Sequence, residues 1–415
     1  MNKPKIRFKG FTEDWEQRKF DDLADYKKGP FGSAITKDMF VPQSDDSIKV
    51  YEQQNAINKD WSLARYFLPK EYALTKLKSF EVHGGDIIVS CAGTIGEIYE
   101  IPENADSGII NQALMRVRVN EDIVDKKMFV IAFSNMIDAF TRTHSNGSAI
   151  KNIPPFADLK PMEVLMPSIA EQKKISGYFA TLDHLITLHQ RKCDETQKLK
   201  KYMLQKMFPK NGATVPEIRF SGFTEDWEQR KFGETVIIER GGSPRPIDAF
   251  ITDDENGLNW VKIGDAPEQG NYITKTAEKI RPEGLKKTRE VHPGDLILSN
   301  SMSFGRPYIM AIDGCIHDGW LLIRDEEKRY DLKFLCQMLG TEQMLAQYRA
   351  MAAGSTVNNL NKELVGNTEV KVPSIAEQAK IGEYFSKVDD LITLHQRKCK
   401  ELQNMKKFML QNMFV

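Results

Sequence analysis

The sequence predicts an α+β fold in which two mixed α/β domains are joined by two long helices, as a pseudo-twofold internal repeat. The first observation is the repeat itself, because residues 6–20 (IRFKGFTEDWEQRKF) return at 218–232 with one change. Residues 167–208 return at 373–414 with 29 of 42 positions identical, whereas the segments between these blocks have diverged. One scaffold therefore presents two different faces, which is the main indication of function.

The second observation is a pair of long amphipathic segments. Ser168 and Glu171, and likewise Ser374 and Glu377, have the spacing of a capping box, so both helices are predicted to begin there. Apolar residues then recur at alternating steps of four and three over five heptads, which is typical of a coiled coil. The seam residues are Ile175, Phe179, Leu182, Ile186, His189, Cys193, Thr196, Lys200, Met203 and Met207, then Ile381, Phe385, Val388, Ile392, His395, Cys399, Leu402, Lys406, Met409 and Met413.

The third observation concerns the diverged middles. Residues 82–90 (VHGGDIIVS) and 291–299 (VHPGDLILS) each predict a turn followed by a buried strand. Helical stretches are predicted at 127–142 and 332–349, and polar G-S loops follow each of them, at 146–152 and at 353–359. The pattern predicts mixed α/β domains without revealing their strand order.

Four segments follow from these patterns. We expect domains at 1–166 and 211–372, and helical spacers at 167–210 and 373–415. Basic residues (Lys and Arg) and acidic residues (Asp and Glu) number 22 and 24 in residues 1–166, and 20 and 25 in residues 211–372. In the helical spacers they number 9 and 4 in residues 167–210, and 7 and 5 in residues 373–415. The domains are thus slightly acidic and the helices basic. If the target is DNA, a partner must supply part of the positive charge.

Composition excludes several classes of protein. With 415 residues, 41% apolar and 28% charged, the chain can fill two cores and is neither disordered nor fibrous. It has no run of 18 apolar residues and no signal-peptide pattern, so we expect no membrane association and a cytoplasmic location. The cysteines are odd in number and scattered, which argues against a disulfide framework or a zinc site. We expect reduced, mostly buried thiols at Cys91, Cys193, Cys315, Cys336 and Cys399.

Catalytic motifs are weak or missing. Residues 152–156 (NIPPF) differ from the N-P-P-F motif of adenine methyltransferases by an inserted isoleucine, and no F-x-G-x-G cofactor loop accompanies them. His83 with Asp86, and His292 with Asp295, are better explained by a turn before a strand than by metal binding or acid–base chemistry. There is neither a Walker loop nor an H-E-x-x-H motif. We expect that the chain is not an enzyme and holds no metal.

Together these motifs resemble a known family. The R-F-x-G-F-x-x-x-W opening, the H-x-G-D strand, the G-S loop and the P-S-I-A-E-Q-x-x-I helix, each present twice, resemble the specificity (S) subunit of type I restriction-modification systems. The resemblance implies two target-recognition domains, each reading one half of a bipartite asymmetric site in double-stranded DNA, and two helices paired antiparallel as a spacer. It also implies two methyltransferase (modification) subunits and restriction motor-nuclease subunits as partners. S-adenosylmethionine, ATP and Mg would bind to those partners, with no cofactor in this chain.

An antiparallel pair has a consequence for the helix midpoints. His189 and His395 would meet at the centre, where polar seam residues fix the register. Cys193 and Cys399 would lie to opposite sides of that centre.

Residues that read DNA are expected in the diverged middles, because side chains at base edges carry specificity. Gln and Asn suit adenine, and Arg suits guanine. The candidates are Lys27, Lys28, Ser33, Lys37, Gln53, Gln54 and Asn55 in the first domain, and Arg240, Ser243, Arg245, Asn300, Ser303 and Arg306 in the second. The two G-S loops, with Lys151 and Asn358, are a second choice.

Two other hypotheses stay open. A self-sufficient DNA adenine methyltransferase is disfavoured by the missing cofactor loop. A coiled-coil scaffold without DNA readout is disfavoured because it gives no reason for the two middles to diverge while their frames stay fixed.

Overall fold

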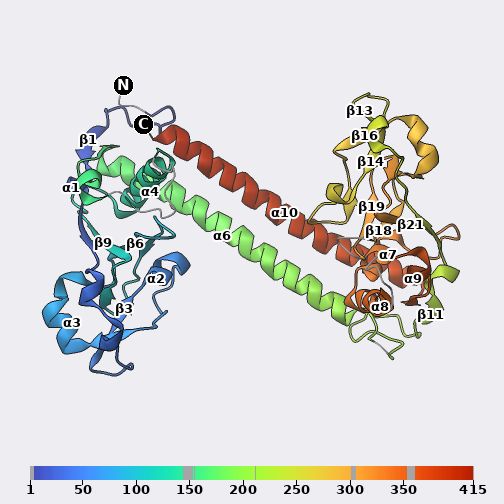
Figure 1. The fold of residues 1–415 in the computed structure, drawn as a ribbon, viewed down its shortest axis with the longest axis horizontal. Coiled ribbons are helices and arrows are strands. Elements are labelled where there is room, and N and C mark those ends of the chain that lie inside the picture. The colour runs from blue at the N-terminus through green and yellow to red at the C-terminus, as the bar shows by residue number, and fades with distance from the viewer. Residues whose placement is uncertain are drawn as a thin grey trace. The chain divides into compact units, whose positions relative to one another are not determined.

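The structure, a computed structural model, describes residues 4–143, 153, 155–210, 212–300, 305–352 and 360–414. The chain divides into two compact units, one of residues 1–184 with 403–415 and the other of residues 185–402. Each unit contains one diverged middle and part of each long helix (Figure 1). The division therefore cuts through both helical spacers.

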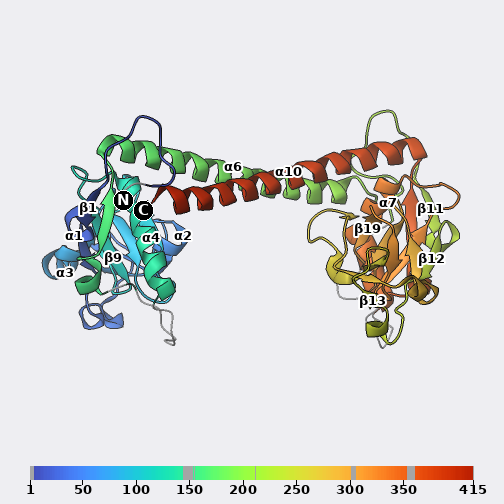
Figure 2. The ribbon, with the colours of Figure 1, turned by 90° about the horizontal axis from the view of Figure 1, so that it is seen from above.

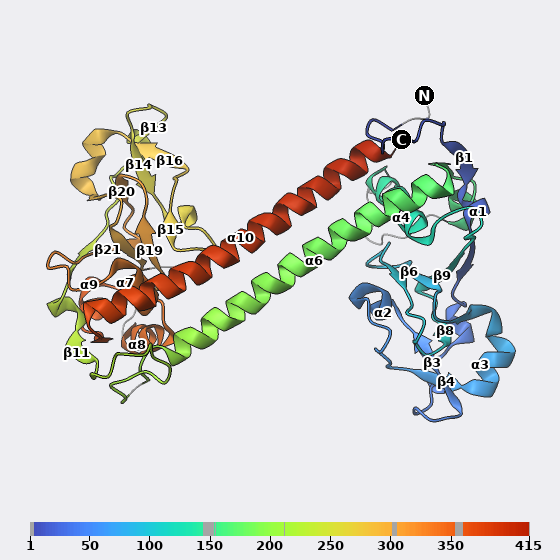
Figure 3. The same cartoon turned by 180° about the vertical axis from the view of Figure 1, so that it is seen from behind.

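Two four-stranded sheets form the middle of unit 1. The antiparallel sheet runs in the order β2 (Ala24–Lys28), β9 (Leu114–Val119), β6 (Ile87–Ser90) and β7 (Ile98–Glu100). The other runs in the order β4 (Phe67–Pro69), β3 (Ser47–Tyr51), β8 (Gly108–Ile110) and β5 (Glu81–Val82), with β3 and β8 parallel. Within this unit the first sheet lies nearer the long helices (Figure 3).

Unit 2 repeats this arrangement with one more strand in each sheet. The first sheet runs in the order β12 (Ile237–Arg240), β21 (Trp320–Arg324), β18 (Leu296–Ser299), β19 (Pro307–Met310) and β15 (Tyr272–Ile273). The second runs in the order β13 (Ile251–Thr252), β16 (Glu278–Ile280), β14 (Leu258–Val261), β20 (Gly314–Ile316) and β17 (Arg289–Val291). β14 pairs in parallel with β20, as β3 does with β8. The two diverged middles therefore share one topology.

A two-stranded ribbon closes each domain. β1 (Glu16–Lys19) pairs antiparallel with β10 (Glu163–Met166), and β11 (Glu228–Lys231) pairs likewise with β22 (Glu369–Val372). The first strand of each ribbon belongs to the repeated opening block, and the second ends just before a long helix. The ribbon thus joins the beginning of each domain to its end.

Shorter helices complete the domains, and one predicted stretch is divided. The described part of the chain contains α1 (Phe20–Leu23), α2 (Gln53–Asn58), α3 (Lys70–Lys76), α4 (Lys126–Thr143), α5 (Phe156–Leu159), α7 (Leu332–Leu339), α8 (Glu342–Ala352) and α9 (Lys362–Gly366). α4 confirms the helix predicted at 127–142. The helical stretch predicted at 332–349 is helical but divided in two, because Gly340 ends α7 and the Thr341 hydroxyl accepts from the Met344 N–H at 3.4 Å, at the start of α8.

The Gly-Asp turns are structural, as the sequence indicates. The Asp86 carboxylate accepts from the His83 N–H at 3.0 Å and from the Arg118 guanidinium at 2.7 and 2.9 Å. Asp295 accepts from the His292 N–H at 2.9 Å and is paired with Arg324. These bonds fix the turn before each buried strand. The G-S loops at 146–152 and 353–359 lie outside the described residues.

The long helices begin where predicted, but their glutamates have a different partner from that of a capping box. α6 (Ile169–Lys206) follows Ser168, and α10 (Ile375–Met413) follows Ser374. Both oxygens of Glu171 accept from Arg7 at 2.7 Å, and both oxygens of Glu377 accept from Arg219 at 2.8 Å. Each glutamate is only 1% exposed. The ion pair ties the opening block of each domain to the helix that follows that domain.

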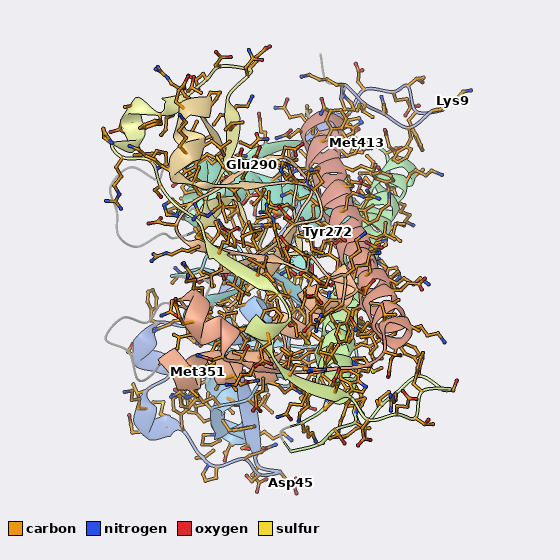
Figure 4. The ribbon with its side chains drawn as sticks, turned by 90° about the vertical axis from the view of Figure 1, so that its right-hand side faces the viewer. Lys9, Asp45, Tyr272, Glu290, Met351 and Met413 are labelled. Carbon is orange, nitrogen blue, oxygen red and sulfur yellow. The ribbon has the colours of Figure 1, made fainter. Side chains whose placement is uncertain are left out.

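The two helices run antiparallel within each unit. In unit 2, Lys200 of α6 contacts Asp389 of α10 at 2.7 Å, and His189 contacts His395. In unit 1, Asp183 of α6 contacts Lys406 of α10 at 2.6 Å. The two Lys–Asp contacts are the same pair in the two repeats. The predicted seam residues are all buried or partly buried, including Met413, which Figure 4 labels near the end of α10.

The predicted meeting of the histidines is confirmed. The Nδ1 atoms of His189 and His395 lie 3.0 Å apart (the helix pair is seen along its length in Figure 2). Cys193 packs against Val388 and Ile392, and the Cys399 Sγ atom lies 3.8 Å from the Gln190 side chain. All five cysteines are free and buried, as expected.

Protonation of His395 should weaken unit 2. Burial, then the neighbouring His189 and Lys192, lower the pKa of His395 below 6.5. On acidification the unfolded chain therefore binds this proton first, so the stabilisation present above pH 6.5 is lost as the pH falls toward the lower, folded-state pKa. We expect the unfolding temperature to fall below pH 6.5 by more in the wild type than in the variant H189L/H395L. If the unfolding temperatures of the two proteins changed equally with pH between pH 5 and 8, this prediction would be wrong.

Loss of the Arg219 guanidinium should destabilise the second domain strongly. In R219M the buried Glu377 carboxylate loses its partner, at a cost of roughly 3–5 kcal/mol. The double variant R219M/E377L should recover most of that loss, because it removes the unpaired charge. The control R230M breaks the exposed Arg230–Glu228 pair and should cost less than about 1 kcal/mol. Denaturant unfolding of the three variants measures these differences, and equal losses in R219M and R230M would refute the argument.

Candidate DNA-recognition surfaces

The candidate surface of unit 1 consists of loops that meet at the ends of four strands. Backbone hydrogen bonds join these loops. The Gly29 N–H donates to the Leu114 carbonyl (2.9 Å), the Asn111 N–H to the Tyr51 carbonyl (3.0 Å) and the Cys91 N–H to the Ala113 carbonyl (2.8 Å). We call the segments 29–36, 52–54, 91–96 and 111–113 the first loop cluster. They follow β2, β3, β6 and β8.

Unit 2 has loops at the equivalent strand ends. In the corresponding hydrogen bonds, the Gly241 N–H donates to the Trp320 carbonyl (2.9 Å), the His317 N–H to the Val261 carbonyl (3.1 Å) and the Asn300 N–H to the Gly319 carbonyl (2.9 Å). We call the segments 241–246, 262–265 and 317–319, with Asn300, the second loop cluster. The two clusters have the same scaffold and almost no sequence in common.

A glycine fixes the start of the main loop in both clusters. A Cβ atom on Gly29 would lie 1.9 Å from the Asn111 carbonyl oxygen, and one on Gly241 would lie 2.2 Å from that of His317. No other residue fits this close backbone approach. The chain therefore leaves β2 and β12 along the same path before the two loops diverge.

Several first-domain candidates are available at the surface. Lys28, Ser33, Lys37 and Gln54 are exposed. Lys27 is partly buried, and its ammonium lies over the Phe80 ring at 4.9 Å from the centroid. Four of the seven candidates can therefore meet a ligand without rearrangement.

Two candidates in the first domain support the fold instead. The Asn55 side chain is 2% exposed, and its amide donates to the carbonyls of Asp60 and Leu63 at 2.9 and 2.8 Å. The amide of the partly buried Gln53 donates to the Ala92 and Thr94 carbonyls and so holds the 91–96 segment. Burial of Asn55 corrects the expectation that it faces a ligand.

The second-domain candidates divide in the same way. Arg240 and Arg245 are exposed, and the partly buried Ser243 donates to the Asp318 carboxylate at 3.0 Å. Asn300 is 2% exposed and its amide donates to the Asp318 carbonyl at 2.9 Å, which corrects the expectation that it is free to read a base.

Arg306 and Ser303 remain. The guanidinium of the partly buried Arg306 donates to the Glu268 carbonyl at 2.7 Å and lies over the Tyr308 ring, so it supports its own domain. Ser303 lies outside the described residues.

The sequence reasoning missed the loop before β9 and its equivalent before β21. Gln112 is exposed, and a Cβ on Gly32 would lie 2.5 Å from its Oε1 atom, so the amide stands beside the first loop. Asp318 is its equivalent 206 residues later. The repeat interval of 206, applied to the diverged middle, would have aligned these two positions from the sequence alone.

Cys91 belongs to the first loop cluster, but burial raises the pKa of its thiol to about 12, so it is protonated and a poor nucleophile. Among the described residues no three His, Cys, Asp or Glu side chains are placed to hold a metal ion. None of the described helices is long and apolar enough to span a membrane.

Comparisons with known proteins agree with the repeat. Residues 12–198 and 224–404 both match the family model described as type I restriction modification DNA specificity domain. The specificity subunits of the type I restriction enzymes MjaVIII and, putatively, MjaX of Methanocaldococcus jannaschii are each 22% identical to the chain, covering 95% of it and 91% of the relative. The type I S subunit of M. genitalium has a similar fold, with a TM-score of 0.61 and 16% identity over 100% of this chain and 99% of that one. The chain therefore belongs to the family of type I restriction-modification DNA specificity subunits.

Proposed function

We propose that each loop cluster reads one half of a bipartite, asymmetric DNA site. The observation that carries the proposal is the equivalence of the two clusters, which start from the same glycine-anchored strand end and present different side chains. A scaffold that is constant where it holds the loops and variable in the loops themselves suits two independent readers. An asymmetric site follows because the two clusters differ.

The exposed side chains supply the two kinds of contact that DNA recognition needs. Lys28 and Lys37 can neutralise phosphates and set the position of the first domain. Gln54 and Gln112 can pair with adenine, and the exposed Arg240 and Arg245 can pair with guanine in the major groove. The net charge of the two middles is nevertheless slightly negative, so tight binding requires positive surface from a partner.

The long helices offer surfaces for two identical partners. Leu199 and Tyr202 on α6 are 48% and 51% exposed, and Met405 and Phe408, 206 residues later on α10, are 49% and 55% exposed. Each pair is spaced by three residues and so lies on one helix face. Exposed apolar residues repeated at equivalent positions support docking of one modification subunit on each pair.

The chemistry then belongs to the partners. The modification subunits would bind S-adenosylmethionine and methylate adenine, and restriction motor-nuclease subunits would use ATP and Mg. This chain would recognise the DNA sequence and provide the assembly surfaces, without a catalytic step of its own. The complex would act in the cytoplasm, where its DNA substrate is accessible.

A chain with two copies of one domain should read a symmetric site. If residues 20–166 replace residues 232–372, both clusters carry the same loops, so the modification complex should methylate a sequence that contains the first half-site twice. Mapping methylated adenines in a plasmid library measures the site, and the reciprocal graft is the control, expected to double the other half. An unchanged site in both grafts would contradict one domain reading one half.

Charge on one helix face should remove one modification subunit. The variant L199E/Y202E places two carboxylates on the docking surface of α6, so native mass spectrometry should show one modification subunit bound in place of two. M405E/F408E should do the same through the other repeat, and all four substitutions together should abolish binding. The control K201E replaces an exposed lysine that is one and two residues from the docking pair and so points to another face, and it should retain both subunits. Full binding to the fourfold variant would exclude this surface.

A further inference from the structure

Phe31 is an exposed ring on a fixed loop. Its side chain is 89% exposed, more than any other large apolar side chain in the described residues. Its carbonyl accepts from the Ala34 N–H at 2.9 Å, and the Tyr72 hydroxyl donates to the Ala34 carbonyl at 3.1 Å. The backbone is therefore held while the ring stands in water. Covering such a ring is favourable, so the loop is prepared for a partner.

The surroundings of Phe31 identify the chemistry of that partner. Residues 27–37 contain three lysines and no carboxylate, so they favour an anion. The Gln112 amide stands beside the same loop at Gly32 and offers both a donor and an acceptor. A polyanion that presents an apolar group next to a donor–acceptor pair matches the major-groove edge of an A·T base pair, with its thymine methyl and its adenine N6 and N7 atoms.

The second cluster has the complementary chemistry at the equivalent positions. Counted from the anchoring glycine, the loop after β12 has Ser243 where Phe31 stands, and an exposed arginine, Arg245, two residues later. Asp318 replaces Gln112 and accepts from the Ser243 hydroxyl at 3.0 Å. Arginine pairs with guanine O6 and N7, and a carboxylate accepts from cytosine N4. The same scaffold position thus changes from an A·T set to a G·C set.

We propose that Phe31 and Gln112 read an A·T base pair in the first half-site, the phenyl ring against the thymine methyl group and the amide on adenine. Arg245 and Asp318 read a G·C pair at the equivalent place in the second half-site. The inference rests on the proposed function, since it requires that each cluster reads one half. It adds which base pair is recognised and by which residues. Two of these residues, Phe31 and Gln112, are neither basic nor part of a recognised motif.

Removal of one thymine methyl group tests the contact directly. The full chain is assembled with its modification subunits, the methylated site is mapped, and each thymine of the first half-site is replaced in turn by deoxyuridine. We expect one replacement to weaken binding by the wild-type complex roughly fourfold, the effect of losing one buried methyl group. The F31A complex should bind both DNA molecules equally and as weakly as the wild type binds the uracil site.

Matched variants separate the two residues. Replacement of the paired adenine by 7-deazaadenine, which lacks the N7 acceptor, should weaken the wild type but not Q112A. F31L keeps an apolar side chain and should retain part of the deoxyuridine effect. The control R245A should retain all of it while losing discrimination of one G·C pair in the second half-site. Phe31 is exposed, so F31A should melt at the wild-type temperature, and a lower value would contradict its placement in solvent.

Four results would overturn the inference, the last of them insertion of the ring between base pairs. One is a first half-site without an A·T pair, another is equal wild-type affinity for thymine and deoxyuridine at every position, and the third is an F31A complex that still senses the methyl group. If 2-aminopurine beside the site brightened with the wild type and not with F31A, the ring would insert between base pairs instead. The domain grafts test the proposed function separately. If the grafts read a symmetric site and loss of the thymine methyl group did not change binding, only this inference would be refuted.

Discussion

The buried arginine–glutamate pair at the start of each long helix is the interaction on which the arrangement depends. Glu171 and Glu377 lose nearly all contact with water, and only a bidentate guanidinium compensates for that loss. Each arginine comes from the repeated opening block and each glutamate from the block that follows the domain. The pair thus closes a loop of more than 150 residues, and the diverged middle is held between its two ends.

A neighbouring glutamine extends this closure into the domain. The Gln172 side chain accepts from the Asp125 N–H at 2.8 Å and donates to the Pro167 carbonyl at 2.8 Å, and Gln378 does the same with Asp331 and Pro373. In the repeated P-S-I-A-E-Q block, the glutamate therefore binds the opening segment, and the glutamine binds the start of the helix that follows the sheets. The identity of this block in the two halves reflects these contacts, whereas the loops at the strand ends are held largely through backbone hydrogen bonds, which leave the side chains free to vary.

Much of the framework could be predicted from the sequence, because its signals are local and periodic. The heptad seam places His189 against His395 once the helices are antiparallel, and a Gly-Asp turn before an apolar strand needs only the next few residues. The division into α7 and α8 was missed because a single Gly-Thr step interrupts an otherwise continuous helical pattern. Arg7 was not assigned because its partner lies 164 residues away in sequence.

The candidate surface was predictable only in part. Lysines and arginines near the strand ends could be named from the sequence, since charge and turn residues are visible there, and their contact with DNA stays a prediction. Asn55 and Asn300 have the same amide chemistry as a reader of adenine, and only their burial shows that the amides hold the backbone. Phe31 and Gln112 were missed for the opposite reason, because only the fold brings the loop that carries Phe31 beside the Gln112 amide, which lies close to Gly32. The most direct test of the whole account is a genome-wide map of methylated adenines in cells that carry the chain with its modification subunits. The account predicts a bipartite, asymmetric sequence whose two halves are separated by unread bases, and a single continuous or palindromic site would contradict it.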